Sequence, residues 1–82
     1  MIHPNLLDQL EMFVSAAELG TFSATAKKLG RSQNVVSYGI STLEESLNVS
    51  LFDRSGHKAV LTETGVALRR QAENIVDAAH GL

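Results

Sequence analysis

Apolar residues recur along most of the chain with the spacing that places them on one face of an α-helix. The first such stripe predicts a helix over residues 5–19, capped by Asn5, and it consists of Leu6, Leu10, Phe13 and Ala17. A second, shorter helix is expected from Ser23, or the residue after it, to Leu29. Ser23 is the expected cap of this helix and Gly30 its end.

The third apolar stripe predicts a helix that begins after Ser32 and closes at Asn48, and it consists of Val36, Ile40, Leu43 and Leu47. The apolar period then changes to two in residues 49–51 and 59–61, which predicts a small β-hairpin. Thr62 is the expected cap of a last helix that runs to the end of the chain. The predicted order is therefore helix, helix, helix, hairpin, helix.

The second and third helices show the spacing of a helix-turn-helix. Ala26 lies where a partner helix must come close, and Gly30 lies where a sharp turn needs a positive φ. Val36 falls in the angle between the two helices. Short helical pairs in other bundles share this pattern, so it indicates the motif without establishing it.

The outward face of the third helix strengthens that interpretation. Its N-terminal half carries uncharged hydrogen-bonding side chains, and the residues on and beside this face are Gln33, Asn34, Ser37, Tyr38 and Ser41. A helix that enters the major groove by its N-terminal half needs such a surface, because Gln and Asn pair with adenine and hydroxyls reach bases or phosphates. An ordinary solvated face has the same composition. Together with the turn pattern and the hairpin, this face favours DNA recognition.

Composition argues mildly against DNA. The 82 residues hold seven Lys+Arg and nine Asp+Glu, a formal net charge of -2, whereas nucleic-acid-binding domains are usually basic. The charge is unevenly spread, however. Residues 1–26 hold three acids and no Lys or Arg, while residues 27–58 hold five cations and three acids. The excess cations therefore lie in the helix-turn-helix and the hairpin, where phosphate contacts would require them.

Candidate contacts to the DNA backbone lie at the starts of the second and third helices and in the hairpin. They are Ser23, Arg31, Ser32, Arg54, His57 and Lys58. The free N–H groups at the two helix starts can hold phosphates as well. Lys27 and Lys28 either join these contacts or only solubilise a helix end, where they suit the helix dipole.

Other chemistry finds little support in the sequence. The chain has no Cys, which excludes disulfides and Cys-based zinc sites, and its three His residues have no partner at helical spacing. We therefore expect no metal site and no cofactor. No Ser/His/acid set is evident, so an enzyme is not expected. The apolar runs are too short to span a membrane and no signal peptide is evident, so no membrane partner is expected.

About residues 5–75, nearly the whole chain, resemble the N-terminal DNA-binding domain of LysR-type transcriptional regulators. The first two helices match through Leu10-x-x-Phe13-Val14-x-x-Ala17 and Thr21-Phe22-Ser23-x-x-Ala26-x-x-Leu29, followed by Ser32-Gln33 and Ser37. The remaining motifs are Ile40-x-x-Leu43-Glu44-x-x-Leu47-x-Val49-x-Leu51-Phe52-x-Arg54 and Leu61-Thr62-x-x-Gly65.

The resemblance implies a mainly α fold. A winged helix-turn-helix, with a three-helix core and a short β-hairpin wing, is expected over residues 1–61, and a long linker or dimerisation helix over residues 62–82. It implies a bacterial, cytoplasmic regulator that binds double-stranded DNA sequence-specifically and is associated with the nucleoid when bound. Residues 33–47 would be the recognition helix in the major groove, and Val35 would add apolar contact with thymine methyls.

The resemblance also implies an assembly. Members bind as homodimers at interrupted inverted repeats, and full-length proteins also form tetramers. A C-terminal domain senses a small-molecule effector, and we expect this domain to be absent from these 82 residues.

Three residues depart from the family's pattern. Asn34 stands where Pro is frequent, and it adds an amide that could contact a base. Tyr38 stands where Arg or another basic or polar residue is frequent, which removes a guanine-reading group. Gly39 either lets the helix approach the groove closely or is simply tolerated. The missing cation and the negative net charge keep a second interpretation open, a winged-helix protein–protein interaction module without DNA binding.

The last helix carries a coiled-coil-like seam with 4-3-4-3 spacing, which consists of Leu68, Ala72, Ile75, Ala79 and Leu82. Val66 and Val76 are expected to widen this stripe toward the domain's own core. The seam either pairs with its twin in a dimer or docks only on its own domain. The resemblance favours dimerisation through this helix.

Overall fold

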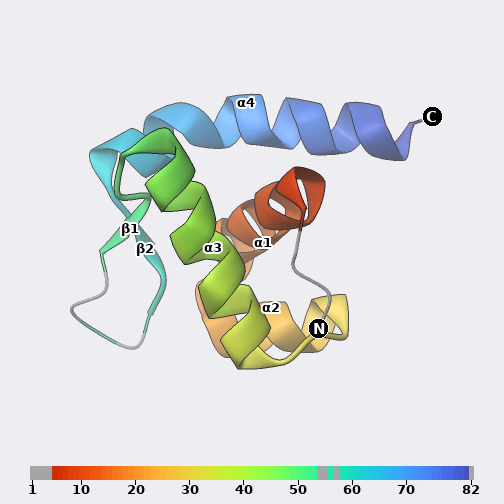
Figure 1. Cartoon of the computed structure of the whole chain (residues 1–82), viewed down its shortest axis with the longest axis vertical. Helices are drawn as coiled ribbons and strands as arrows, with labels where there is room; N and C mark the ends of the chain where they lie inside the picture. Colours follow the sequence, from red (N-terminus) through yellow and green to blue (C-terminus); the bar gives the residue numbers. More distant parts are fainter. Residues whose placement is uncertain (1–4, 54–55, 57, 82) are drawn as a thin grey trace.

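The computed structural model describes residues 5–53, 56 and 58–81, and within them it has four helices and one two-stranded antiparallel hairpin (Figure 1). The elements in chain order are α1 (Leu6–Leu19), α2 (Phe22–Leu29), α3 (Gln33–Leu47), β1 (Phe52–Asp53), β2 (Val60–Leu61) and α4 (Glu63–His80). The predicted mainly helical winged helix-turn-helix and its element order are confirmed. None of the helices in the described part of the chain has the length and apolarity needed to cross a membrane.

The core lies between α1, α2 and α3 and is completed by the start of the hairpin and by α4. Its buried residues include Met12, Phe13, Ala16, Ala26, Val36, Ile40, Leu43, Leu51, Phe52 and Ala72. α2 lies at the N-terminal end of α3 and α4 lies at its opposite end (Figure 1). The Phe52 ring meets Phe13 and Phe22 edge to face, with ring centroids 5.7 and 5.6 Å apart. Such pairs add to the burial of apolar area, so Phe52 fixes the start of the hairpin against the helices.

Helix caps follow the sequence prediction at three of the four N-termini. Asn5 forms a full capping box with Asp8, Ser32 accepts from the Val35 N–H at 3.1 Å, and Thr62 accepts from the Gly65 N–H at 3.0 Å.

The prediction that Ser23 caps the second helix is wrong. The cap is Thr21, whose hydroxyl accepts from the Ala24 N–H at 3.0 Å, and Ser23 is an exposed residue of the first turn. The earlier start makes Phe22 the first helical residue, with its ring against Phe52. The cap at Thr21 therefore goes together with the contact between Phe22 and Phe52, which a cap at Ser23 would leave outside the helix.

The hairpin is shorter than predicted, and its first strand lies later in the chain. Phe52 pairs with Leu61 and Asp53 pairs with Val60, so residues 49–51 are outside the strand. Leu51 is fully buried, and its N–H donates to the Glu44 carboxylate at 2.6 Å instead of to a strand partner. The alternating pattern in 49–51 reflects burial beside the helices, not pairing.

α4 docks on the domain through one face that runs along the helix past its middle. Ala72 is 3% exposed and Leu68 packs against the core. The expectation that Val66 faces the core is wrong, because its side chain is 63% exposed, whereas Val76 is half-buried beside α1. Beyond Ala72 the helix carries an exposed Ile75, and at its end His80 lies 3.1 Å from the Glu11 carboxylate of α1.

Candidate nucleic-acid interface

The turn between α2 and α3 has the geometry that its sequence predicts. Gly30 has a left-handed φ of 66°, and its N–H donates to the carbonyls of Ala26 and Lys27. The Arg31 N–H also donates to the Ala26 carbonyl at 3.0 Å, which closes the end of α2. Ala26 and Val36 are buried where the two helices meet, so α3 is held at a fixed angle with its first turn directed outward.

The N-terminal half of α3 presents an uncharged polar surface, as predicted. Gln33 and Asn34 are exposed, and Tyr38 is 50% exposed. Ser37 and Ser41 are half-buried at the edges of this surface. We call these five residues the α3 reading face.

Two further residues of α3 sit differently from the expectation. Val35 is half-buried and packs against the core, so less of it remains for a thymine methyl than its sequence position suggests. Gly39 is buried on the inward side of the helix with Val36 and Ile40. It therefore does not belong to the α3 reading face, and a direct role in approaching the groove finds no support.

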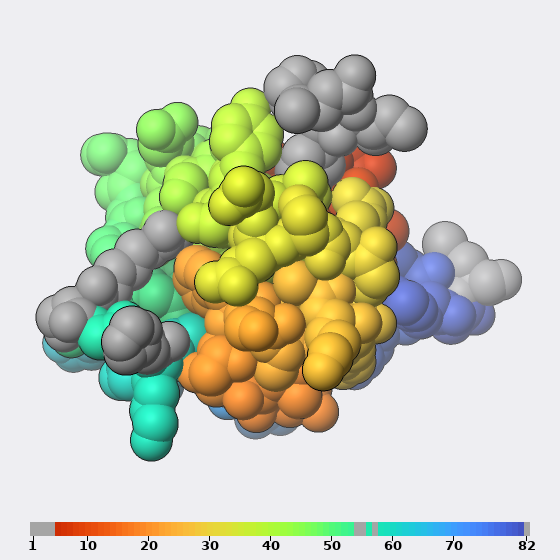
Figure 2. Space-filling model, turned by 90° about the horizontal axis from the view of Figure 1, so that it is seen from below, coloured from red at the N-terminus to blue at the C-terminus, as the bar shows by residue number. Residues whose placement is uncertain are grey.

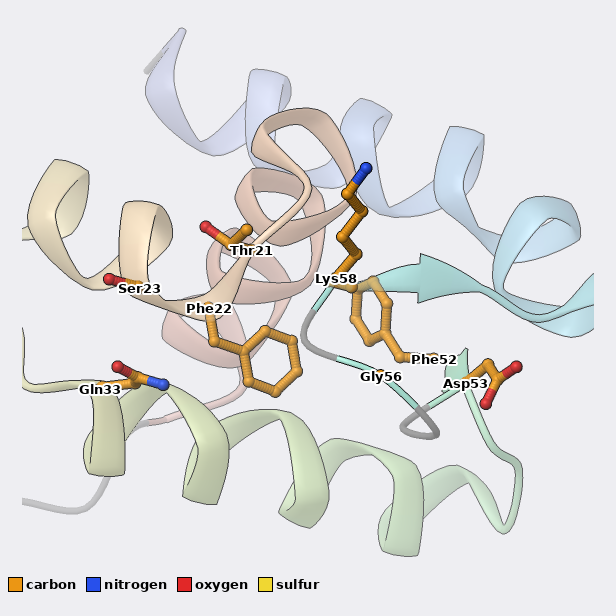
Figure 3. A pocket seen from close by; sticks show the side chains of 9 residues that line it. Thr21, Phe22, Ser23, Gln33, Phe52, Asp53, Gly56 and Lys58 are labelled. Carbon is orange, nitrogen blue, oxygen red and sulfur yellow. The ribbon is translucent and has the colours of Figure 1, made fainter.

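A cleft of about 570 Å³ separates α2 and α3 from the hairpin. Its lining includes Thr21 and Ser23 from the start of α2, Gln33 from the start of α3, and Lys58 from the hairpin, around the paired rings of Phe22 and Phe52 (Figure 3). α2, the start of α3 and the hairpin all lie on one face of the molecule, with α4 largely behind them (Figure 2). This face therefore combines a protruding helix start with a polar-rimmed cleft.

The backbone of the hairpin is anchored to this face from both sides. The Glu44 carboxylate accepts from the N–H groups of Leu51 and Phe52, at 2.6 and 3.3 Å. On the other strand, the Ala59 N–H donates to the Gly20 carbonyl at 2.7 Å. Glu44 belongs to the family motif, but no periodic pattern in the sequence indicates its contact with Leu51, seven residues further along the chain.

The start of α4 also holds the hairpin in place. The Thr62 hydroxyl donates to the Ser50 carbonyl at 2.5 Å, and the Thr62 N–H donates to the Leu51 carbonyl at 2.9 Å. A Cβ at Gly65 would collide with the Leu51 carbonyl oxygen and lie 2.9 Å from Leu61 Cδ2. Only glycine therefore fits at this crossing of α4 and the chain that enters β1.

The predicted cations lie in different surroundings. The Arg31 guanidinium is 3.6 Å from the Asp8 carboxylate and Lys28 is 4.0 Å from Glu18, so both have acidic partners on α1. Lys58 is exposed at the rim of the cleft. Arg54 and His57 lie outside the described residues. Ser32 is exposed, with its hydroxyl already in the cap of α3.

The predicted dimerisation residues do not form one continuous exposed seam. Leu68 and Ala72 belong to the domain's own packing, Ile75 is 51% exposed, Ala79 is half-buried, and Leu82 lies outside the described residues. Ile75 borders an apolar groove of about 220 Å³ between α1, α3 and α4, whose lining includes Leu6 and Leu47. Each of these two leucines has more than 45% of its surface exposed to solvent.

A helix-turn-helix with an outward third helix and a flanking hairpin defines the chain as a winged helix-turn-helix domain. Residues 7–66 match the family described as the bacterial regulatory helix-turn-helix protein, lysR family. The chain belongs to this family and carries the DNA-binding domain of a transcriptional regulator.

Relatives and solved structures agree with this assignment. The chain is 41% identical over 73 residues to a probable RuBisCO transcriptional regulator of Cyanophora paradoxa, covering 89% of this chain and 22% of that protein. It is 38% identical over 76 residues to the probable HTH-type transcriptional regulator YhaJ of Escherichia coli, covering 93% and 26%. The chain thus spans about a quarter of the length of these curated relatives.

Two similar structures are DNA complexes of separate DNA-binding domains. The CbnR domain bound to DNA superposes with a TM-score of 0.86 at 34% identity, covering 93% of this chain and 87% of that one. The BenM domain bound to benA site 1 DNA superposes with a TM-score of 0.87 at 27% identity, covering 94% and 90%.

Proposed function

We propose that the chain binds double-stranded DNA sequence-specifically, with the N-terminal half of α3 in the major groove. The observation that carries this proposal is the α3 reading face, an exposed set of uncharged donors and acceptors at the start of a helix that is fixed by the turn at Gly30. Recognition helices make base contacts with their N-terminal residues. The DNA complexes of the similar CbnR and BenM domains support the same mode.

The proposed contacts divide into two groups. Base contacts come from the α3 reading face, that is Gln33, Asn34, Ser37, Tyr38 and Ser41, with Val35 as a lesser apolar contact. Phosphate contacts come from the starts of α2 and α3 and from the wing, that is Ser23, Arg31, Ser32, Arg54, His57 and Lys58. Phosphate contacts position the domain, and base contacts select the sequence.

We further propose that the DNA-bound form is a homodimer on an interrupted inverted repeat. In this scheme residues 1–61 read DNA and residues 62–82 pair with a second copy, with the exposed Ile75 and the adjacent apolar groove as its core. A two-fold axis would place two recognition helices on two half-sites. Tetramer formation and a small-molecule effector would belong to the longer protein implied by the relatives' lengths.

A binding measurement tests the main proposal. Fluorescence anisotropy of the 82-residue chain against genomic fragments should reveal fragments that bind in preference to random DNA, with affinity falling as salt rises. Lys58→Ala should weaken preferred and random DNA equally and reduce the salt slope by about one. No binding to any fragment at low salt would contradict the proposal.

That negative result would favour a winged-helix protein–protein interaction module without DNA binding. Two observations point toward it. The recognition helix carries no Lys or Arg, and the nearby Arg31 already pairs with Asp8. A salt-dependent gel shift separates the two functions, because the module would retard no DNA.

A further inference from the structure

The α3 reading face has no positive charge of its own. Gln33–Leu47 contains no Lys or Arg, and its two acids, Glu44 and Glu45, lie in the C-terminal half. Arg31, which precedes the helix, is 3.6 Å from Asp8 and therefore directed toward α1. The commonest specific contact to guanine is a bidentate Arg or Lys to its O6 and N7 atoms. α3 itself can make no such contact.

We infer that the α3 reading face selects A·T base pairs, with the amides of Gln33 and Asn34 on adenine and the Tyr38 ring on the thymine methyl group. This inference rests on the proposed function. Asn and Gln present the donor and acceptor that match adenine N7 and N6. Both amides are exposed in the first turn of α3, where base contacts are made.

Tyr38 is the main apolar contact, and Val35 remains a lesser one. Val35 is partly covered by the core, whereas half of the Tyr38 side chain is open to solvent. Tyr38 lies one helical turn after Asn34, about 6 Å along the helix axis. This distance corresponds to about two base-pair steps when the helix follows the groove. One amide and one ring can therefore serve two A·T pairs about two steps apart.

The other groups on α3 do not oppose this preference. Ser37 and Ser41 carry hydroxyls, which can contact A·T and G·C pairs alike. Glu45 is exposed and a carboxylate can accept from cytosine, but it lies about 16 Å from Asn34 along the helix. At that distance it faces the rim of the groove. Glu44 is engaged with the N–H groups of Leu51 and Phe52.

Selection from a randomised duplex library tests the inference with the 82-residue chain. Wild type should enrich A·T over G·C about tenfold at two or more adjacent positions of each half-site. Asn34→Arg should shift one of these positions to G·C, because it supplies the missing guanidinium. Asn74→Arg makes the same chemical change on the exposed face of α4 and should keep the A·T preference.

Three outcomes would overturn the inference or its basis. Enrichment of G·C by wild type, or an Asn34→Arg variant with unchanged base preference, would refute A·T selection and leave the proposed function intact. Retention of DNA at low salt without enrichment of any sequence would refute the proposed sequence-specific function itself.

A second measurement isolates Tyr38. Replacing the contacted thymine by uracil removes one methyl group and should weaken wild-type binding about fourfold, the effect of one buried methyl. Tyr38→Phe keeps the ring and should keep this sensitivity, whereas Tyr38→Ala should lose it. A Tyr38→Ala variant that still loses fourfold on uracil would refute the assignment of the thymine contact to Tyr38.

Discussion

Single residues decide where the elements begin and how closely they approach. The caps at Asn5, Ser32 and Thr62 were predictable because each is a small polar residue within one helical turn of the first apolar residues of a helix. The cap of α2 was not, because Thr21 and Ser23 both fit locally. The choice of Thr21 goes together with the contact between Phe22 and Phe52, which are thirty residues apart in the chain. Local pattern carries no information on such a contact.

Gly65 offers a direct test of close approach. Gly65→Ala should destabilise the domain by about 1–2 kcal/mol, because its Cβ would meet the backbone carbonyl of Leu51, which cannot rotate away. The higher helix propensity of Ala offsets only part of this strain. Urea unfolding measures the change in the free energy of unfolding.

The matched control is Gly81→Ala at the other end of α4. There the nearest atom to a new Cβ is the Asp77 carbonyl oxygen at 3.4 Å, so the free energy of unfolding should change little. Equal effects of the two substitutions would show that the crossing at Leu51 is not tight.

At the scale of elements, the helical stripes were sufficient to predict α1 and α3 almost to their ends. The hairpin was not, because its register depends on bonds from outside the strands. Glu44 in α3 and Thr62 before α4 hold the chain at residues 50–52 and leave only two residues per strand for pairing. An alternating apolar pattern cannot distinguish a paired strand from a buried extended segment.

Glu44→Ala should therefore loosen the wing. It removes the acceptor of two backbone N–H groups in partly buried surroundings, which should lower the free energy of unfolding by about 1–3 kcal/mol. Thermal or urea unfolding measures the loss, and hydrogen exchange of the Leu51 amide localises it.

Glu45→Ala is the control for the same charge change one residue later. Glu45 is exposed, and its substitution should change stability by less than about 0.5 kcal/mol. If both variants lose stability equally, the loss reflects the charge of α3 and not the anchoring of the wing.

At the scale of the whole molecule, charge and apolar surface are divided between two regions. The net charge of -2 is accompanied by ion pairs of Arg31 and Lys28 with acids of α1, which partly offset two of the cations of the helix-turn-helix. We therefore expect weak non-specific DNA binding and a strong dependence on base contacts and dimerisation. The sequence predicted the exposed polar face, but not the pairing of Arg31, because Asp8 lies in another helix.

The apolar region near Ile75 tests the dimer. Ile75→Glu places a charge beside the groove formed with Leu6 and Leu47 and should abolish dimerisation while the monomer stays folded, since Ile75 is half exposed. Sedimentation analysis with and without an inverted repeat measures the association. Val66→Glu makes a similar change on the same helix away from the groove and should leave association unchanged. Equal behaviour of the two variants would exclude the Ile75 surface as the interface.

Base reading by α3 is the central claim, and the affinity of Asn34→Ala for a preferred site and for random DNA tests it most directly. Asn74→Ala serves as the control on α4. Loss of the Asn34 amide should weaken binding to the preferred site by about 1–3 kcal/mol, roughly 5- to 150-fold, and leave random DNA unaffected. Equal weakening on preferred and random DNA would contradict base reading by α3.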